Sequence, residues 1–233
     1  MHEPSPLQSL PAMRRDRWTL LDSLIDRWCT SSAEPPGFTL DDVRTAERSL
    51  GFSIPSALTE WYCSSGKRRS VWSRQDEFLP PDRLHVQNDA LIFYVENQAV
   101  VQWGIPMDQL ALDDPSVVVE SVDDADQWIP QTDKLSKFAI YMFAYTLAFA
   151  DGDYWVYGYA KPPLVDTIVS RFPMLDFPTT WWTQTRLFGY DDIIVAIDGT
   201  DHVHACAVSK AALAAFNALT TQDTLDMYAS SDA

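Results

Sequence analysis

Cysteine and glycine are both scarce in this chain, and their arrangement excludes several common kinds of site. The three cysteines, Cys29, Cys63 and Cys206, are odd in number and form no CxxC pair, which argues against a disulfide framework and against a structural zinc site. None of the eight glycines belongs to a GxGxxG, GxxxxGK[ST] or GxSxG motif, and HExxH is absent. The sequence therefore contains no signature of a dinucleotide fold, a P-loop, a hydrolase nucleophile elbow or a zinc protease.

Positive charge is also scarce. Seventeen Lys and Arg residues stand against thirty-three Asp and Glu residues, giving a net charge of −16 in 233 residues. Such a chain repels phosphate backbones and anionic lipid surfaces, so we expect no direct binding to nucleic acid and none to membranes. The longest apolar-rich stretch, Phe138–Ala150, is too short to span a bilayer, and Met1–Met13 holds no apolar run typical of a signal peptide. We expect a cytoplasmic protein.

What the chain does have is aspartate and aromatic residues. Twenty-six of the thirty-three acidic residues are Asp, a poor helix former that favours turns and caps, so much of the charge is expected on loops. Nine Trp, nine Tyr and eleven Phe suit either a core of bulky rings or a binding surface with large anchors.

Helical periodicity dominates the first quarter of the chain. Apolar residues recur at helical spacing over Asp16–Trp28, and the Pro- and Gly-containing stretch Thr30–Gly37 then forms a connector. Thr39 can cap a second helix that Asp42 supports from its first turn, and Gly51 stands where a left-handed cap is expected. A third helix follows Pro55 and ends at Gly66.

Strand-like runs occupy the middle of the chain and recur near its end. Leu91–Val95 and Gln98–Trp103 indicate a hairpin, and Ser116–Ser121 indicates another strand. A helix with Leu135 and Phe138 on its apolar face comes next. Further expected elements are an aromatic stretch at Tyr154–Tyr159, a hairpin of Ile193–Ile197 with His202–Val208, and a helix capped by Ser209. These patterns predict an α+β fold with a mostly antiparallel central sheet flanked by helices.

The segment Phe38–Tyr62 (FTLDDVRTAERSLGFSIPSALTEWY) resembles the opening of the SUKH superfamily, in which AE, LG and LP pairs precede a Leu and a Tyr. The strands at 91–105, the run at 114–120, Trp128 and the helix from Leu135 resemble the later elements of that family, in the same order, over about residues 38 to 150. The chain departs from the pattern at Ser64-Ser65-Gly66, where an Asn before the Gly is more usual, and its C-terminal part is longer. On this basis we expect an N-terminal tail, helix and linker over 1–37, a SUKH-like domain over 38–220 and a C-terminal tail over 221–233.

The resemblance implies a partner-binding scaffold without chemistry of its own. Most bacterial members are immunity proteins that neutralise polymorphic toxins, often nucleases, and the family also includes a eukaryotic regulator of cell-wall synthesis. We therefore expect a non-enzymatic protein that binds a basic toxin domain. A regulatory scaffold for a host protein and a metal-dependent enzyme that uses Asp-rich loops are the alternatives.

Two patterns could hold a metal ion, but simpler interpretations are favoured for both. His202, His204 and Cys206 fall on one face of the expected strand, with Asp198 and Asp201 in the turn, yet no fourth ligand stands at a recognisable spacing. Asp151-Gly152-Asp153 has the composition of an ordinary turn after a helix. The sequence thus assigns no catalytic residue, no metal ligand and no cofactor.

Acidic turns beside the central strands are the candidate partner-binding residues. They surround one tryptophan, which could anchor a partner while the carboxylates attract and hold a basic surface; the alternative is that the charge serves only solubility. The candidates are Asp113, Asp114, Asp123, Asp124, Asp126 and Trp128.

Overall fold

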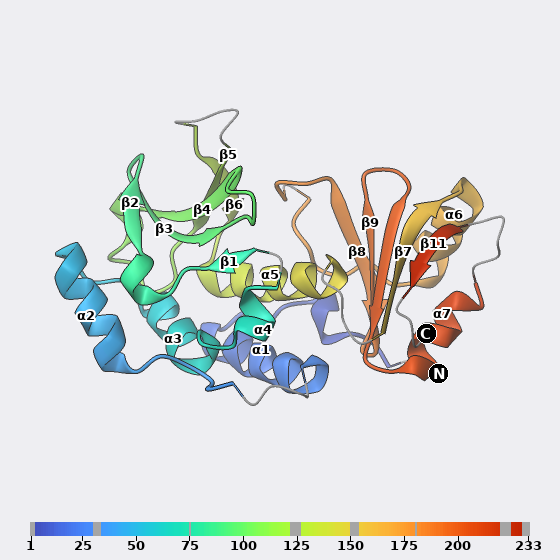
Figure 1. The fold of residues 1–233 in the computed structure, drawn as a ribbon, viewed down its shortest axis with the longest axis horizontal. Coiled ribbons are helices and arrows are strands. Elements are labelled where there is room, and N and C mark those ends of the chain that lie inside the picture. The colour runs from blue at the N-terminus through green and yellow to red at the C-terminus, as the bar shows by residue number, and fades with distance from the viewer. Residues whose placement is uncertain are drawn as a thin grey trace. The chain divides into compact units, whose positions relative to one another are not determined.

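The computed structural model describes residues 3–29, 34–74, 76–121, 127–149, 154–179, 181–219 and 225–229 (Figure 1). The chain divides into two compact units, one formed by Pro11–Phe143 and the other by Met1–Leu10 together with Ala144–Ala233. The chain passes from one unit to the other twice: between Leu10 and Pro11, and between Phe143 and Ala144. The second boundary lies inside one continuous helix, at a point that no proline or glycine marks.

The unit formed by Pro11–Phe143 combines helices with a sheet in the order β1-β3-β4-β5-β6, and β2 pairs with β3. Every strand pairing in its described residues is antiparallel. Its helices are α1 (Arg14–Trp28), α2 (Leu40–Leu50), α3 (Ser56–Ser65), α4 (Arg69–Trp72) and the start of α5 (Leu135–Phe149), with 3-10 turns at Pro81–Arg83 and Met107–Gln109. Its strands are β1 (Glu77–Phe78), β2 (His85–Gln87), β3 (Ala90–Val95), β4 (Val101–Pro106), β5 (Val117–Ser121) and β6 (Ile129–Thr132).

Local sequence signals set the ends of these elements. Thr39 Oγ1 accepts the Asp42 N–H (3.1 Å), and the Asp42 carboxylate accepts the Thr39 N–H (2.9 Å), which completes the expected capping box of α2. Gly51 ends that helix at φ +82°, in the left-handed region that favours glycine. The predicted hairpin is confirmed as β3–β4. Its loop is longer than expected, because the Glu96 carboxylate accepts the N–H groups of two loop residues, Gln98 and Val100.

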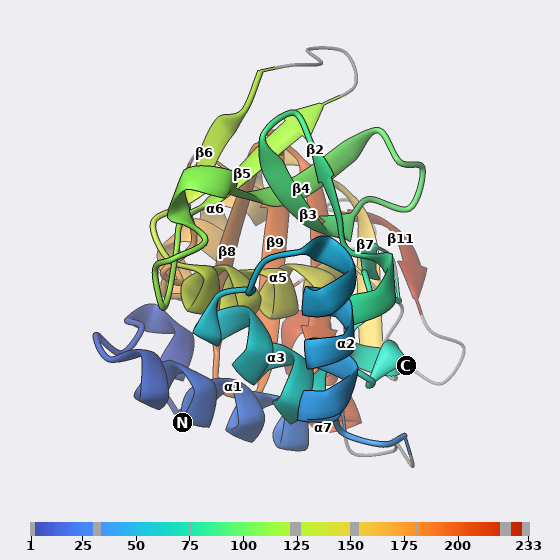
Figure 2. The same ribbon diagram turned by 90° about the vertical axis from the view of Figure 1, so that its left-hand side faces the viewer.

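The core of this unit is aromatic and centres on Trp61 of α3. The Trp61 ring stacks on Phe78 with centroids 4.3 Å apart and meets Trp72 edge-on at 4.9 Å. Phe138 of α5 and Phe93 of β3 also pack on this ring: their centroids lie 6.3 and 6.1 Å from that of Trp61 and 5.5 Å from each other. In this unit α5 therefore lies between the sheet and the layer of α1 and α3, as Figures 1 and 2 show.

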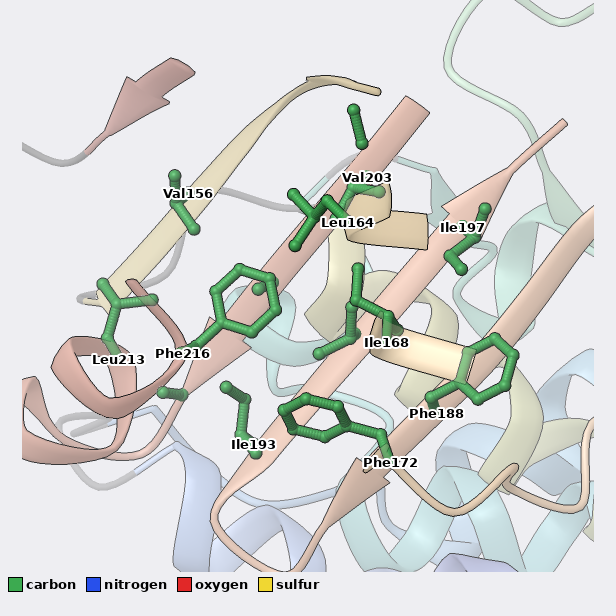
Figure 3. Close-up of a cluster of buried hydrophobic side chains, with 14 of the residues drawn as sticks. Val156, Leu164, Ile168, Phe172, Phe188, Ile193, Ile197, Val203, Leu213 and Phe216 are labelled. Atoms are coloured by element: carbon green, nitrogen blue, oxygen red, sulfur yellow. The ribbon is translucent and has the colours of Figure 1, made fainter. Parts of the chain in front are cut away.

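The unit that contains Ala144–Ala233 is built on a second antiparallel sheet, in the order β11-β7-β10-β9-β8. Its strands are β7 (Tyr154–Ala160), β8 (Thr185–Tyr190), β9 (Ile193–Asp198), β10 (His202–Ala207) and β11 (Leu225–Ala229), and its helices are α6 (Pro162–Arg171) and α7 (Lys210–Asn217). Both helices cover the same face of the sheet. Figure 3 shows the buried cluster between them, where Leu164 and Ile168 of α6 and Leu213 and Phe216 of α7 meet residues of the strands.

The structure confirms the expected α+β class and the hairpin whose register pairs His202 with Asp198. The antiparallel pairing that was expected is found in two sheets, since the described strands after α5 form a sheet of their own. Helix α6 was not anticipated, although Pro162 and Pro163 occupy first-turn positions, where proline is tolerated.

The unit boundaries also differ from the expected ranges 1–37, 38–220 and 221–233. Residues up to Leu10 belong with the second sheet: Pro4 forms a bridge with Tyr190, and the Asp176 N–H donates to the Leu7 carbonyl (2.8 Å). In the described ranges, no helix has both the length and the apolar composition that crossing a membrane requires.

Candidate functional site

Asp113 and Asp114 are adjacent in sequence but differ sharply in their environments. The Asp113 side chain is 80% exposed and accepts the Ser56 hydroxyl at 2.8 Å, next to the start of α3. Asp114 is buried, with 8% of the residue exposed. Only Asp113 therefore keeps the exposed position that a partner-binding carboxylate needs.

The Asp114 carboxylate belongs to a buried network with Arg17 and Ser136. It lies 2.9 Å from Arg17 Nη2 and accepts both the backbone N–H (2.9 Å) and the hydroxyl (2.7 Å) of Ser136. Arg17 Nε donates to Ser136 Oγ at 2.7 Å, and Arg17 Nη1 donates to the carbonyls of Pro11 and Ala12. Asp114 is therefore removed from the candidate partner-binding residues, because the ion pair occupies its carboxylate in the interior.

Trp128 lies half-buried against the sheet of its unit. Its ring packs on the small cluster of Leu79, Ala90, Ile92 and Val118. Its indole N–H donates to the Asn88 carbonyl at 2.6 Å, which fixes the orientation of the ring. The other candidates, Asp123, Asp124 and Asp126, lie outside the described residues.

A tight turn between β2 and β3 holds the partner of Trp128. Asn88 and Asp89 both have positive φ, at +46° and +60°, which is typical of the type I′ turn of a two-residue hairpin. The Asn88 carbonyl accepts the indole of Trp128, and the Asp89 carbonyl accepts the Met107 N–H at 2.9 Å. Since both carbonyls are engaged, the turn is fixed while the Asp89 residue stays exposed.

Beneath this turn lies Glu120, a buried carboxylate that the sequence did not single out. Only 3% of the residue is exposed, and its oxygens accept the side-chain amides of Gln87 (3.3 Å), Asn88 (2.7 Å) and Gln102 (2.6 Å). Hydrogen bonds of this number are what a buried carboxylate requires. Glu120 thus ties the turn of Asn88 to strands β4 and β5.

These contacts form one side of a groove of about 520 Å³. The residues that line it are Asn88, Asp89, Pro106, Met107, Asp108 and Trp128. Two of the six are acidic, both of them exposed, and none is basic. An indole ring beside two carboxylates offers a cation both a ring face and opposite charge.

The structure therefore groups Trp128 with acidic residues other than those that the sequence nominated. Asp89 and Asp108 are 39 and 20 positions away in sequence, so adjacency along the chain could not identify them. The Asn88-Asp89 pair between two extended runs is a recognisable hairpin signal. It would have placed Asp89 at a turn, but it could not have placed Trp128 beside it.

The His202–His204 strand segment forms an aromatic face in the other unit. His204 stacks with Tyr157 (centroids 5.3 Å apart) and contacts Phe149 (4.4 Å), and its Nε2 lies 3.4 Å from His202 Nδ1. Burial, and secondarily the neighbouring His202, lowers the pKa of His204 to about 4, so that its ring is neutral at pH 7.

Within the described residues, no group of three or more His, Cys, Asp or Glu side chains is arranged to hold a metal ion. Cys206 is buried. The Asp151-Gly152-Asp153 turn lies outside the residues that the structure describes.

Asp76 is a third acidic residue in the interior of the Pro11–Phe143 unit, in addition to Asp114 and Glu120. It is 4% exposed, and its carboxylate accepts the Asn97 N–H at 3.3 Å. Burial, with a smaller contribution from Glu96, raises the pKa of Asp76 to about 6. Two basic residues that precede it in sequence, Lys67 and Arg68, pair with Asp42 and Asp26.

Comparison with protein-family models, with curated proteins and with solved structures finds no match to this chain.

Breaking the Arg17–Asp114 pair from either side should destabilise the protein strongly. We expect Arg17→Ala and Asp114→Ala each to lower the free energy of unfolding by about 3–5 kcal/mol, because each leaves a buried charge without its partner. Arg17→Met with Asp114→Leu should recover much of that loss. Urea unfolding measures these values, and Arg44→Ala, which removes an exposed pair with Asp41, is the control with an expected cost below about 1 kcal/mol. Single variants as stable as this control would contradict a buried ion pair.

Asp76→Asn should stabilise the protein in a pH-dependent way. A carboxyl group whose pKa is raised on folding binds its proton more tightly in the folded state than in the unfolded state. Above pH 6 the group is buried as an anion, which lowers the free energy of unfolding. Below about pH 4 it is protonated in both states, and this cost is absent. The amide keeps an oxygen for the Asn97 N–H, so we expect a gain of about 1–2 kcal/mol at pH 7 that disappears by about pH 4. Urea unfolding at several pH values measures it, with the exposed Asp82→Asn as control. A gain that is equal at pH 4 and pH 7 would exclude ionisation as its cause.

Proposed function

We propose that this protein is a non-enzymatic binding module that neutralises a basic protein toxin in the cytoplasm by occupying its functional surface. The observation that carries the proposal is the groove in which Trp128 lies beside Asp89 and Asp108. The resemblance of residues 38–150 to SUKH proteins suggests the class of partner, and the groove suggests where that partner binds.

Charge supports a basic partner. The chain carries a net charge of −16, and none of the residues lining the groove supplies a positive charge that would compete with an incoming Lys or Arg. Nuclease domains are commonly basic where they hold phosphates, so an acidic surface can cover that region. Such complementarity speeds association and makes it sensitive to salt.

The rigidity of the groove also supports binding. Trp128 is oriented by Asn88, Asn88 is held by Glu120, and Glu120 is held by three amides. A surface that is fixed before binding loses little conformational entropy when a partner docks. A half-buried Trp with polar residues around it is the kind of anchor that dominates binding energy in protein interfaces.

The test is capture of the tagged protein's partner from its native cells, followed by kinetics with the purified pair. We expect Asp89→Asn with Asp108→Asn to slow association by about tenfold at low salt, since both carboxylates attract a basic surface. The matched control is Asp41→Asn with Asp133→Asn, which removes the same charge from exposed residues that do not line the groove. Equal effects of the two double variants would exclude the groove as the docking site.

Trp128→Leu separates anchoring from charge. We expect it to weaken the complex by about 2 kcal/mol or more, roughly 30-fold, mainly through faster dissociation. Thermal unfolding of the free variant shows how much of the change comes from the lost packing on Ile92 and Val118. The captured partner must be toxic when expressed alone and harmless with this protein. A partner that is acidic, or whose activity is unchanged in the complex, would refute the proposed neutralisation.

A further inference from the structure

A second cavity, unrelated to the groove, lies in the unit that contains Ala144–Ala233. It has a volume of about 320 Å³ and opens beside α6, α7 and the start of β9. Its apolar lining consists of Phe172, Ile193, Ala212, Ala215, Phe216 and Leu219. Figure 3 shows Phe172, Ile193 and Phe216 together at the end of the buried cluster away from Val203.

The cavity exists because α7 presents small side chains toward it. Ala212 is buried and Ala215 is exposed, one helical turn apart, and neither fills the space in front of Phe216. Long apolar side chains at these positions would close the cavity against Phe172. A volume of about 320 Å³ lies at the lower end of the range for small-molecule sites, which suits one short chain or ring rather than a nucleotide.

One of the residues that line the cavity is basic. Arg171, the last residue of α6, lines it and is exposed, and no hydrogen bond or ion pair of its guanidinium is found in the described part of the chain. Tyr190 also lines the cavity, and its hydroxyl donates to the Arg171 carbonyl at 2.7 Å and holds that end of the helix in place. Asp191 and Asp192 follow Tyr190 in sequence but are not among the lining residues.

We propose that this cavity binds a small amphipathic monocarboxylate, with its hydrocarbon part between Phe172, Ile193 and Phe216 and its carboxylate at Arg171. An apolar cavity gains from burying hydrocarbon, and the planar guanidinium matches a carboxylate with two parallel hydrogen bonds. Because Arg171 is the one basic residue of the lining, the site favours a ligand with a single negative charge. The site is independent of the partner-binding groove and of the toxin proposal.

Titration with sodium octanoate, followed by methyl NMR and calorimetry, tests the site directly. We expect saturable one-to-one binding, with shifts in the methyl signals of Ile193, Ala212, Ala215 and Leu219. Ala215→Leu should reduce the affinity at least about tenfold, because the larger side chain occupies the ligand's space. Ala214→Leu is the matched control: Ala214 is exposed on the same helix but does not line the cavity.

The role of charge is tested with Arg171→Gln and with 1-octanol as the neutral probe. We expect the substitution to weaken octanoate by about fivefold and to leave 1-octanol unchanged, since only the carboxylate uses the guanidinium. Thermal unfolding checks that each variant is folded. The proposal is overturned by an absence of saturable octanoate binding to the wild-type chain, by equal affinities of Ala215→Leu and Ala214→Leu, or by equal losses for both probes in Arg171→Gln.

Discussion

The buried guanidinium of Arg17 is the constraint on which the arrangement of the Pro11–Phe143 unit depends. Its donors are matched by Asp114, Ser136 and the carbonyls of Pro11 and Ala12, so helix α1, the segment before β5 and the start of α5 must meet at one point. Because Arg17 is only 4% exposed, losing any of these partners would lower the free energy of unfolding substantially. The same requirement turns Asp114 inward and leaves its neighbour Asp113 on the surface.

Four acidic residues of this unit fall into two groups with different roles. Asp114 and Glu120 are buried and joined to donors by several hydrogen bonds each, and they hold segments of the fold together. Asp89 and Asp108 are exposed and free to act on something outside the chain. The second group depends on the first, because Glu120 positions Asn88, whose carbonyl orients Trp128 at the groove. An acidic composition thus serves the fold and the candidate site through one connected set of contacts.

The sequence predicted those features whose interacting residues lie close together along the chain, and missed those whose residues lie far apart. The capping box of Thr39 with Asp42, the cap at Gly51 and the hairpin around Asp198-Gly199 involve residues within a few positions, and the structure confirms all of them. The burial of Asp114 depends on Arg17, 97 positions away, and the orientation of Trp128 depends on Asn88, 40 positions away. The sequence also gives no sign of the unit boundary within α5. The residues on both sides of that boundary are apolar and mostly buried, so the composition of the helix does not change there. The residues next to Trp128 in sequence could indicate it as an anchor, but they could not identify Asp89 and Asp108 as the carboxylates of the groove.

The two proposed sites rest on different physical forces, and salt distinguishes them. Attraction between the groove's carboxylates and a basic partner acts over several ångströms through solvent, so it weakens as the screening length shortens. Burial of a hydrocarbon chain against Phe172 and Phe216 is not screened, and only the contact with Arg171 is. The net charge of −16 repels a carboxylate ligand at long range. Salt weakens this repulsion and also weakens the attraction to Arg171, so its two effects on ligand binding oppose each other. Ligand binding in the cavity should therefore change little over a range of salt in which partner binding at the groove falls steeply.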